Sequence, residues 1–418
     1  MDLTDSRKIV IVGGGQAAAQ SAASLRLWGY TGDLTIVGDE AALPYQRPPL
    51  SKAYLKGEMG EERLYFKPNA WFAEHDVNMA VNTRATAIDR SERMLKLSDD
   101  GSLPYDALIL STGSRPRTLP VPGADLKGVH DLRTLADVDH LRPLMAEGRS
   151  IVIIGAGYIG LETAAVGAQL GLNVTVLEMA DRVLARVTSP LISAFYHALH
   201  TRNGVDIRTG ARVSGLIGNN TGHVTGVSLD DGETVAADLV LAGIGIVPNV
   251  ELASDAGIAC DDGILVDRDA RTNDARIFAA GDCARRPLVH YGRTGRLESV
   301  HNAIEQGKLA AAAITGQARP AEDVPWFWSD QYDVKLQIAG LSEGHDQVVV
   351  RGDPDSGRFA AFYLKQDALL AVDAVNAAPE FLASKKLIQM GANLARADLS
   401  DMSISMKQIA ANAKQAAA

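Results

Sequence analysis

The sequence predicts an α/β protein in which two parallel β-sheets are followed by a smaller α+β unit. Two occurrences of the same order of elements indicate the parallel sheets. A short apolar strand, a glycine-rich turn, a helix and a second strand occur in that order near the N-terminus, and the same order returns after residue 150. The third observation is a change near residue 327, where strand-like runs follow one another before a long helical pattern begins.

The first of these strand–turn–helix–strand units has the pattern of a dinucleotide site. Its strand, helix and second strand are expected at residues 8–12, 16–28 and 34–37. Gly13 would make the tight turn, Gly15 would leave room for a pyrophosphate, and the small Ala18 would let the helix pack closely on the strand. Asp39 follows the second strand, where a carboxylate can accept hydrogen bonds from ribose hydroxyls.

The second unit carries the fuller form of the same pattern. Its strand is expected at residues 151–154, its helix up to residue 170, and its second strand at 174–177. The turn contains Gly155, Gly157 and Gly160, and Glu178 stands 21 residues after Gly157. A carboxylate at that place accepts a bond from the ribose 2′-hydroxyl and repels a 2′-phosphate. Because the next three residues carry no cation and Arg182 is expected to lie past the pocket, the sequence favours NADH over NADPH.

Two such units in one chain, 142 residues apart, predict two Rossmann-like dinucleotide-binding domains. One dinucleotide is expected to be a bound flavin, FAD, which receives a hydride from NADH where the two domains face each other. The expected domains are residues 1–116 and 248–326 for FAD, 117–247 for NAD, and 327–418 for the C-terminal α+β domain. In the last of these we expect strands at 335–338, 347–350, 359–364 and 369–375, and helical structure from residue 379 onward.

Composition and charge exclude several other classes of protein. The 418 residues carry a net charge of −10, which argues against general nucleic-acid binding. The only cysteines, Cys260 and Cys283, have no redox or metal-like spacing, and the histidines have no metal-ligand spacing either. Residues 1–8 lack the apolar core of a signal peptide, and no apolar run of about 18 residues occurs. We therefore expect a cytoplasmic protein without a metal or a membrane anchor.

Further segments strengthen the assignment to a known family. They are residues 45–52, 111–116, 242–249, 277–282, 298–303 and 325–331. These segments resemble those of the FAD-dependent pyridine nucleotide-disulphide oxidoreductase superfamily. They are most similar to its ferredoxin reductase branch, which serves cytochromes P450 and aromatic-ring dioxygenases. The resemblance extends from residue 9 to about residue 407. It implies a glutathione-reductase-like fold with two three-layer ββα domains and a C-terminal α+β domain.

The resemblance also implies roles for individual residues. FAD would be bound by Gly13, Gly15, Ala17, Ala18, Asp39, Arg47, Lys52, Ala85, Thr112, Gly113, Arg133, Gly281, Asp282, Val300 and Trp328. NADH would be bound by Gly155, Gly157, Ile159, Gly160, Glu162, Glu178 and Gly245. Lys52 and Glu162 would be the catalytic pair, with Lys52 near the flavin N5 where the nicotinamide arrives. A helix over residues 301–310 would direct its positive end toward the flavin's pyrimidine side.

The missing cysteines indicate where the electrons go. The disulfide-reductase relatives need two cysteines, and the peroxidase relatives one, in the segment between Asp39 and Lys67, which contains none here. Reduced flavin must therefore pass electrons to an external acceptor, and a one-electron carrier such as a 2Fe–2S ferredoxin suits it. Such carriers are usually acidic, so a basic docking surface is expected. Its candidates are Arg285, Arg286, Arg293, Arg296, Lys308, Lys385, Lys386 and Lys407.

Two other functions remain open at this point. An NADH oxidase or diaphorase would pass electrons to oxygen or a quinone without a protein carrier. A redox-sensing interaction protein like apoptosis-inducing factor would use NADH mainly to switch conformation, and that family shares the loop at residues 47–52. The leading hypothesis is an NADH:ferredoxin oxidoreductase, monomeric or weakly dimeric, that supplies a cytochrome P450 monooxygenase system or a ring-hydroxylating dioxygenase.

Overall fold

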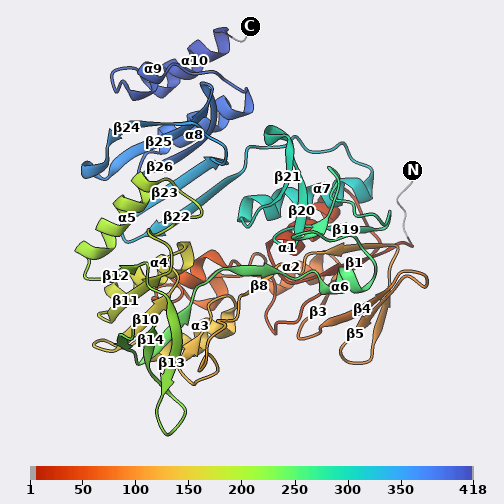
Figure 1. Ribbon diagram of the computed structural model, residues 1–418. Coiled ribbons are helices and arrows are strands. Elements are labelled where there is room, and N and C mark those ends of the chain that lie inside the picture. Colours follow the sequence, from red (N-terminus) through yellow and green to blue (C-terminus); the bar gives the residue numbers. More distant parts are fainter. Residues whose placement is uncertain (1–5, 417–418) are drawn as a thin grey trace. The chain divides into compact units, whose positions relative to one another are not determined.

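The computed structural model describes residues 6–416, so residues 1–5 of the polar N-terminal segment and residues 417–418 of the expected C-terminal helical pattern lie outside it. Contacts group the chain into two units (Figure 1). The first comprises Met1–Gln46, Glu61–Arg115 and Ile246–Asp323, and the second comprises Arg47–Gly60, Pro116–Gly245 and Val324–Ala418. Since residues 116–245 and 324–418 group together, the division into three domains stays a prediction.

The first unit is built on a five-stranded parallel sheet with the strand order β19-β7-β1-β2-β3. Its elements are β1 (Lys8–Val12), α1 (Gln16–Leu27), β2 (Asp33–Val37), α2 (Asn69–Glu74), β3 (Val77–Ala80), β4 (Ala85–Asp89), β5 (Met94–Leu97), β6 (Ser102–Pro104), β7 (Ala107–Leu110), β8 (Ser114–Pro116), β17 (Ile246–Pro248), α6 (Glu251–Asp255), β18 (Ile264–Leu265), β19 (Ile277–Ala279), β20 (Ala284–Leu288), β21 (Arg293–Arg296) and α7 (Val300–Thr315), with short 3-10 turns at Glu61–Arg63 and Val289–Tyr291.

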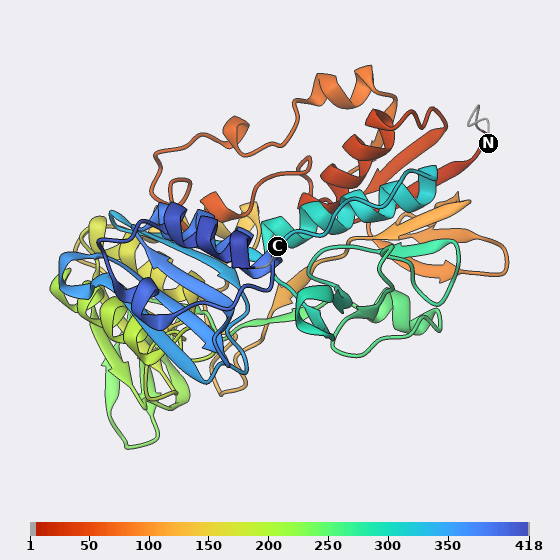
Figure 2. The ribbon, with the colours of Figure 1, turned by 90° about the horizontal axis from the view of Figure 1, so that it is seen from above.

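Helices α1 and α7 lie side by side on one face of this sheet (Figure 2). Gly307 of α7 permits this close approach, because a Cβ there would lie only 2.9 Å from the Ala17 carbonyl oxygen of α1. The other face of the sheet packs against the antiparallel β4-β5-β6 sheet, through side chains such as Ile88 and Leu95. These layers are the predicted ββα arrangement.

The second unit contains another five-stranded parallel sheet, with the order β12-β11-β10-β16-β9. Its elements up to residue 245 are β9 (Val129–His130), α3 (Leu135–Leu141), β10 (Ser150–Ile154), α4 (Tyr158–Gln169), β11 (Asn173–Glu178), α5 (Pro190–Arg202), β12 (Asp206–Thr209), β13 (Val213–Gly218), β14 (Val224–Leu229), β15 (Thr234–Ala236) and β16 (Leu239–Ala242), with 3-10 turns η1 (Pro48–Ser51) and Arg142–Leu144. The antiparallel β13-β14-β15 sheet packs on β10 and β16 through Leu216 and Val227.

The C-terminal part of this unit is a five-stranded antiparallel sheet with helices, in the order β22-β23-β26-β25-β24. Its elements are β22 (Trp326–Gln331), β23 (Val334–Gly340), β24 (Gln347–Asp353), β25 (Arg358–Lys365), β26 (Ala368–Val375), α8 (Ala378–Gln389), α9 (Arg396–Ser400) and α10 (Met406–Ala416), with a 3-10 turn at Pro354–Ser356. The fold class predicted from the sequence is thus confirmed.

The helical pattern expected from residue 379 onward is divided into three helices. Helix α8 ends before Gly391, which takes a left-handed φ of +61° and so cannot continue the helix. Helix α9 ends at Ser400. The carbonyl oxygen of Leu399, in its last turn, accepts a hydrogen bond from the buried Arg351 side chain. Periodicity alone could not show these breaks, because all three helices bury apolar side chains against the same core.

Among residues 6–416, no helix combines the length and the apolar character that crossing a bilayer requires. In that same part of the chain, no three His, Cys, Asp or Glu side chains gather as a metal site would need.

Candidate functional site

The first glycine turn has the shape that a bound pyrophosphate needs. Gly13 adopts a φ of +114°, and a Cβ there would lie 2.1 Å from the Ser111 carbonyl oxygen, so only glycine fits. At Gly15, the N-cap of α1, a Cβ would meet no atom within 4 Å, and no side chain caps the helix. Ala18 is fully buried against the sheet. The turn therefore leaves open space in front of the amide groups at a helix N-terminus, where phosphate binds.

Four further predicted FAD residues of the first unit lie just past the carboxyl ends of its strands. Thr112 and Gly113 follow β7, and Gly281 and Asp282 follow β19. Asp282 accepts a hydrogen bond from the Ser114 hydroxyl at 2.8 Å, while Gly281 donates its N–H to the buried Gln306 at 2.6 Å. These ends of parallel strands are where open α/β sheets bind their ligands.

Four more predicted FAD residues belong to this unit. Asp39 follows β2 and forms an exposed ion pair with Arg84 at 3.2 Å. Ala17 lies in the first turn of α1, Ala85 begins β4, and Val300 begins α7, a helix that extends over the expected residues 301–310 and further to Thr315.

The second glycine turn repeats the geometry of the first. Gly155 has a φ of +103°, and a Cβ there would meet the Gly243 carbonyl oxygen at 2.4 Å. A Cβ on Gly160 would lie 2.2 Å from the Gly155 carbonyl oxygen, so this glycine is needed for the helix to approach the strand. Gly157, the N-cap of α4, again faces open space. The residues present therefore fit a dinucleotide at this turn as they do at the first.

The end of β11 carries the carboxylate that the sequence predicts to favour NADH over NADPH. Glu178 accepts the N–H of Ala156 at 2.7 Å and the N–H of Ala180 at 2.8 Å, one on each carboxylate oxygen. The guanidinium of Arg182 is engaged elsewhere, since it donates to the carbonyls of Ala185 and Thr188 and to a serine hydroxyl. The Glu178 carboxylate is thus fixed beside the turn. Arg182, the nearest arginine in the sequence, forms its hydrogen bonds with residues 185–193 instead.

Two further predicted NADH residues flank this turn. Ile159, in the first turn of α4, is an exposed apolar side chain. Gly245 takes a φ of +102°, and a Cβ there would contact the side chains of Arg186 and Arg117.

Lys52 and Glu162 form an ion pair within the second unit, in which the glutamate is buried and the lysine is partly exposed. Lys52 Nζ lies 2.6 Å from Glu162 Oε2, and the glutamate side chain is only 2% exposed. The same oxygen accepts the Ser51 hydroxyl at 2.5 Å, and the other oxygen accepts the Ser329 hydroxyl at 2.6 Å. Three donors from η1, its C-cap and β22 therefore satisfy a carboxylate that burial would otherwise destabilise.

The remaining predicted FAD residues also fall in the second unit. Arg47 donates from its guanidinium to the Arg133 carbonyl oxygen at 2.7 Å. Trp328 lies on β22, where its ring is 5.5 Å from that of Trp326. The structure thus brings Lys52 together with Glu162, and Arg47 together with Arg133.

Ser51 and Ser329 were not predicted from the sequence. Both lie inside segments that resemble the family, but serine is a common surface residue and carries no spacing signal. The alternation in β22 contained a hint, because Ser329 and Gln331 share one face of a strand otherwise rich in aromatic residues.

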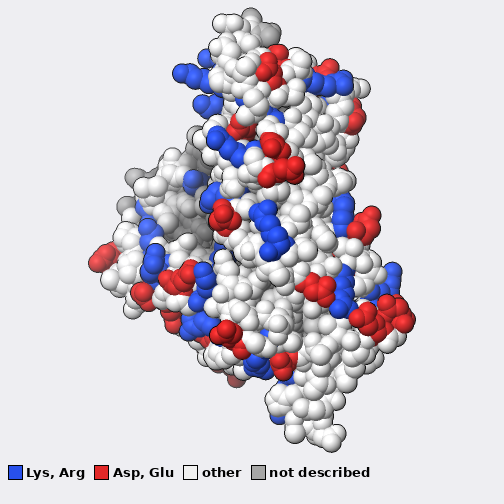
Figure 3. Space-filling model, turned by 90° about the vertical axis from the view of Figure 1, so that its left-hand side faces the viewer, with Lys and Arg blue, Asp and Glu red and all other residues white. Residues whose placement is uncertain are grey.

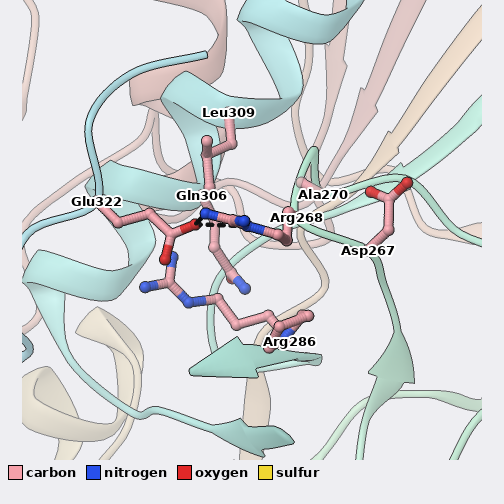
Figure 4. Close-up of a pocket in the computed structure, with 8 residues that line it drawn as sticks. Asp267, Arg268, Ala270, Arg286, Gln306, Leu309 and Glu322 are labelled. Carbon is pink, nitrogen blue, oxygen red and sulfur yellow. Dashed lines mark hydrogen bonds and ion pairs between the residues drawn. The ribbon is translucent and has the colours of Figure 1, made fainter. Parts of the chain in front are cut away.

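Two of the predicted docking arginines are not available to a partner. Arg286 is 6% exposed and pairs with Glu305 at 3.1 Å. It lies under the Arg268–Glu322 ion pair and beside Gln306 (Figure 4). The side chain of Arg296 is also largely buried, and it contacts Glu298 and Asp262. The prediction was wrong for both, because no sequence pattern indicates that neighbouring carboxylates draw these side chains inward.

The other predicted docking cations remain at the surface. Lys308, Lys386 and Lys407 are exposed, as is Arg293. Arg285 forms an ion pair with Asp261, and Lys385 lies over the Trp326 ring at 5.6 Å. On the face of the molecule drawn in Figure 3, Lys and Arg are interspersed with Asp and Glu rather than gathered in one large field.

Cys283 has the environment of a core thiol, and Cys260 is partly buried against the same core. Cys283 is fully buried, and burial raises the pKa of its thiol. Burial likewise raises the pKa of Cys260. A raised pKa reduces the thiolate population on which thiol redox chemistry depends.

Comparison with known proteins places these features in one family. Residues 7–307 match the family model described as pyridine nucleotide-disulphide oxidoreductase, and residues 326–410 match the one described as reductase C-terminal. The chain is 45% identical to rhodocoxin reductase of Rhodococcus erythropolis over 380 residues, which is 91% of this chain and 89% of that protein. It is 44% identical to putidaredoxin reductase of Pseudomonas putida, covering 97% of each chain.

Solved structures agree with the sequence comparison. The putidaredoxin reductase of a covalent complex with putidaredoxin superposes with a TM-score of 0.96 at 44% identity, over 98% of this chain and all of that one. The ferredoxin reductase for the CYP199A2 system of Rhodopseudomonas palustris gives 0.94 at 42% identity, over 97% of this chain and all of that one.

Proposed function

Because the chain belongs to the pyridine nucleotide-disulphide oxidoreductase family, we propose that it is an NADH-dependent ferredoxin reductase. FAD is its cofactor and NADH its reductant. The observation that carries the proposal is the similarity, over 98% of the chain, to a reductase whose structure was solved in complex with its redox protein. The lack of any cysteine between residues 39 and 67 supports an external acceptor.

Bound FAD supplies a ring that accepts a hydride and can release electrons one at a time. The Gly13–Gly15 turn and the start of α1 would hold its pyrophosphate, and Asp282 would bind the ribityl–pyrophosphate region. The other FAD contacts are proposed as the family resemblance implies them. The division into two dinucleotide domains and a C-terminal domain is proposed with them.

NADH would bind at the Gly155–Gly160 turn with its adenine ribose beside Glu178. A fixed carboxylate there would accept the 2′-hydroxyl and repel a 2′-phosphate. Arg182 would not offset that repulsion, because its guanidinium already donates to loop carbonyls. These contacts support a preference for NADH.

Glu162 would help to position the nicotinamide, and it holds the Lys52 ammonium at 2.6 Å. Orientation of the two reacting groups accounts for much of the rate of such transfers, because the reacting atoms must approach to about 3–3.5 Å. A charged pair that is itself fixed by two serine hydroxyls can provide that orientation without reorganising.

The acceptor is proposed to be a 2Fe–2S ferredoxin that serves a cytochrome P450 or a ring-hydroxylating dioxygenase, and the protein is proposed to be cytoplasmic. The exposed lysines among the predicted docking residues, Lys308, Lys386 and Lys407, are available for an acidic partner.

NADH-driven reduction of cytochrome c tests this function, measured with and without an added 2Fe–2S ferredoxin. We expect a large dependence of the rate on the ferredoxin. Equal rates together with rapid oxygen consumption would indicate an NADH oxidase instead. Slow turnover with a long-lived complex of reduced flavin and NAD would indicate a redox-sensing interaction protein.

A further inference from the structure

A series of hydrogen bonds leads away from the buried Glu162 carboxylate into the second unit. Glu162 Oε1 accepts the Ser329 hydroxyl at 2.6 Å, and Gln331 Nε2 lies 3.1 Å from Ser329 Oγ. Gln331 Oε1 lies 2.8 Å from His200 Nε2, and His200 Nδ1 lies 3.2 Å from the Tyr332 hydroxyl. This polar series, Glu162–Ser329–Gln331–His200–Tyr332, connects four residues that were not predicted as site residues to one that was.

The series is built from three secondary-structure elements and is shielded from water. Ser329 and Gln331 are two positions apart on β22, so they face the same side of the strand. Both are buried, as is His200 on α5, whose exposed fraction is 0%. Buried polar atoms need partners within the protein. The series provides partners for these side chains, and none of its links is at the surface except Tyr332, which is partly exposed.

Each hydrogen bond in the series has a fixed direction. A carboxylate can only accept, so the Ser329 hydroxyl donates to Glu162 and its oxygen accepts from the Gln331 amide N–H. The Gln331 carbonyl oxygen then needs a donor, so His200 carries its hydrogen on Nε2. Nδ1 is left as an acceptor for the Tyr332 hydroxyl. Every donor therefore points toward Glu162.

Two further observations concern the His200 end of the series. Burial lowers the pKa of His200 to about 4, with the Gln331 hydrogen bond opposing the shift, so the ring is neutral at pH 7. Tyr332 has a φ of +56°, a left-handed conformation that is costly for a residue with a large side chain. In that conformation its ring packs edge-to-face on His200 with centroids 5.1 Å apart.

We propose that His200 is a positioning residue for hydride transfer, acting through Gln331 and Ser329 on Glu162. The inference rests on the proposed function, in which Lys52 and Glu162 lie where the nicotinamide arrives. A carboxylate held at both oxygens cannot rotate, and it therefore holds the Lys52 ammonium in one place. Without the Ser329 hydroxyl, Glu162 loses its donor at Oε1. Without His200 that donor remains, but the Gln331 amide that orients it loses its own partner, so the orientation of the ion pair is less firmly fixed.

Nitrogen NMR of the holoenzyme labelled with ¹⁵N-histidine tests the series without any turnover. At pH 7 we expect His200 to show a protonated Nε2 and an unprotonated Nδ1, with its signals identified by their loss in His200→Phe. The Ser329→Ala variant should keep this tautomer, because the Gln331 carbonyl oxygen still needs a donor. A His200 that carries its hydrogen on Nδ1, or that is doubly protonated at pH 7, would overturn the inference.

Stopped-flow reduction of the flavin by NADH tests the link to the reaction. Loss of one hydrogen bond to a charged group corresponds to about a tenfold to hundredfold slower limiting rate in Ser329→Ala. We expect the dissociation constant of NADH to change by less than about twofold, since the adenosine contacts are untouched. His200→Phe should slow the limiting rate by about threefold, because the amide of Gln331 loses its anchor.

The double variant distinguishes positioning from general disturbance. Once the Ser329 hydroxyl is absent, His200 has no route to Glu162, so Ser329→Ala with His200→Phe should be no slower than Ser329→Ala alone. Multiplied effects of the two substitutions would contradict the inference. Tyr196→Phe is the matched control on α5, because this buried hydroxyl makes no hydrogen bond within the part of the chain the structure describes. It should leave the rate unchanged.

The outcomes also separate this inference from the proposed function. If the wild-type holoenzyme is not reduced by NADH, the function fails whatever the NMR shows. If the wild type is reduced and the Ser329 and His200 variants keep its rate, only the positioning role fails. Flavin content and melting temperature are measured for each variant, and should His200→Phe fold poorly, Gln331→Met breaks the series between the same two ends.

Discussion

Glu178 is held by two backbone amides, from Ala156 and Ala180, at the edge of the second glycine turn. In Glu178→Lys we expect weaker use of NADH and improved use of NADPH, because the new cation attracts a 2′-phosphate. Loss of charge-assisted hydrogen bonds corresponds to about a tenfold to hundredfold fall in kcat/KM for NADH. Glu178→Gln is the control, which removes the charge without adding a cation. An unchanged ratio of the two kcat/KM values would contradict the ribose assignment.

Asp282 follows β19 and accepts the Ser114 hydroxyl at 2.8 Å. In Asp282→Ala we expect weaker retention of FAD, by about tenfold in the dissociation constant, since a carboxylate hydrogen bond to the bound cofactor is lost. Ser114→Ala separates the two contributions, because it removes only the partner of the carboxylate. Flavin fluorescence released on dilution measures the retention. An Asp282→Ala protein that stays fully flavinated would remove this residue from the FAD site.

Asp373 is a buried carboxyl on β26 whose pKa burial raises from 3.8 to about 7, while the Tyr363 hydroxyl donates to it at 2.5 Å. Between these two pH values the folded state keeps a proton that the unfolded state has released. The stabilisation is therefore complete below about pH 4 and lost as the pH rises through 7. It amounts to at most about 4 kcal/mol.

We expect the free energy of unfolding of the wild type to fall between pH 5 and pH 8 relative to that of Asp373→Asn, which keeps a neutral side chain throughout. Urea unfolding at several pH values measures the difference. Parallel pH curves for the two proteins would show that Asp373 does not titrate in this range.

At the scale of elements, Arg351 on β24 joins the C-terminal helices to the antiparallel sheet. Its guanidinium donates to the carbonyl oxygens of Leu399, Asp401 and Ile404, and it pairs with the buried Glu380 at 3.2 Å. These carbonyls include those of Leu399, near the end of α9, and of its C-cap residue Asp401. One arginine thus donates hydrogen bonds to three backbone carbonyl groups at the end of α9 and in the segment that leads to α10.

In Arg351→Met we expect a loss of about 3–5 kcal/mol, because Glu380 is left as an uncompensated buried charge and the carbonyls lose their donor. Arg396→Met is the control, since the Arg396–Asp367 ion pair is exposed and such pairs contribute at most about 1 kcal/mol. Chemical unfolding, with proteolysis after residue 390 as a second measurement, tests the difference. Equal losses in the two variants would be inconsistent with this role.

The glycine turns could be predicted from the sequence because their physical requirements are local. A left-handed φ at Gly13 and open space at Gly15 follow from residues close together in the chain. The two strands that flank each glycine turn and its helix, and four of the five strands of the C-terminal sheet, followed from apolar runs of the right length, with ends that differ by at most three residues; β22 was not among the expected strands.

The environment of the Lys52–Glu162 ion pair could not be predicted in the same way. Ser329 and His200 approach Glu162 only after β22, α5 and α4 have packed together, and no short-range pattern specifies that meeting. The same reason explains the error at Arg286, whose carboxylate partner Glu305 lies 19 residues away. Side-chain contacts that form only through tertiary packing could not be predicted from the periodicity of the sequence.

Across the whole molecule, both glycine turns are closed by one backbone oxygen from the loop after a neighbouring strand, that of Ser111 for Gly13 and that of Gly243 for Gly155. An engineer who wishes to change the coenzyme cannot work at either glycine, because a Cβ there would lie 2.1 Å or 2.4 Å from that backbone oxygen. Redesign must begin after β2 and at the end of β11, where Asp39 and Glu178 present their carboxylates, and it must leave both glycine turns unchanged.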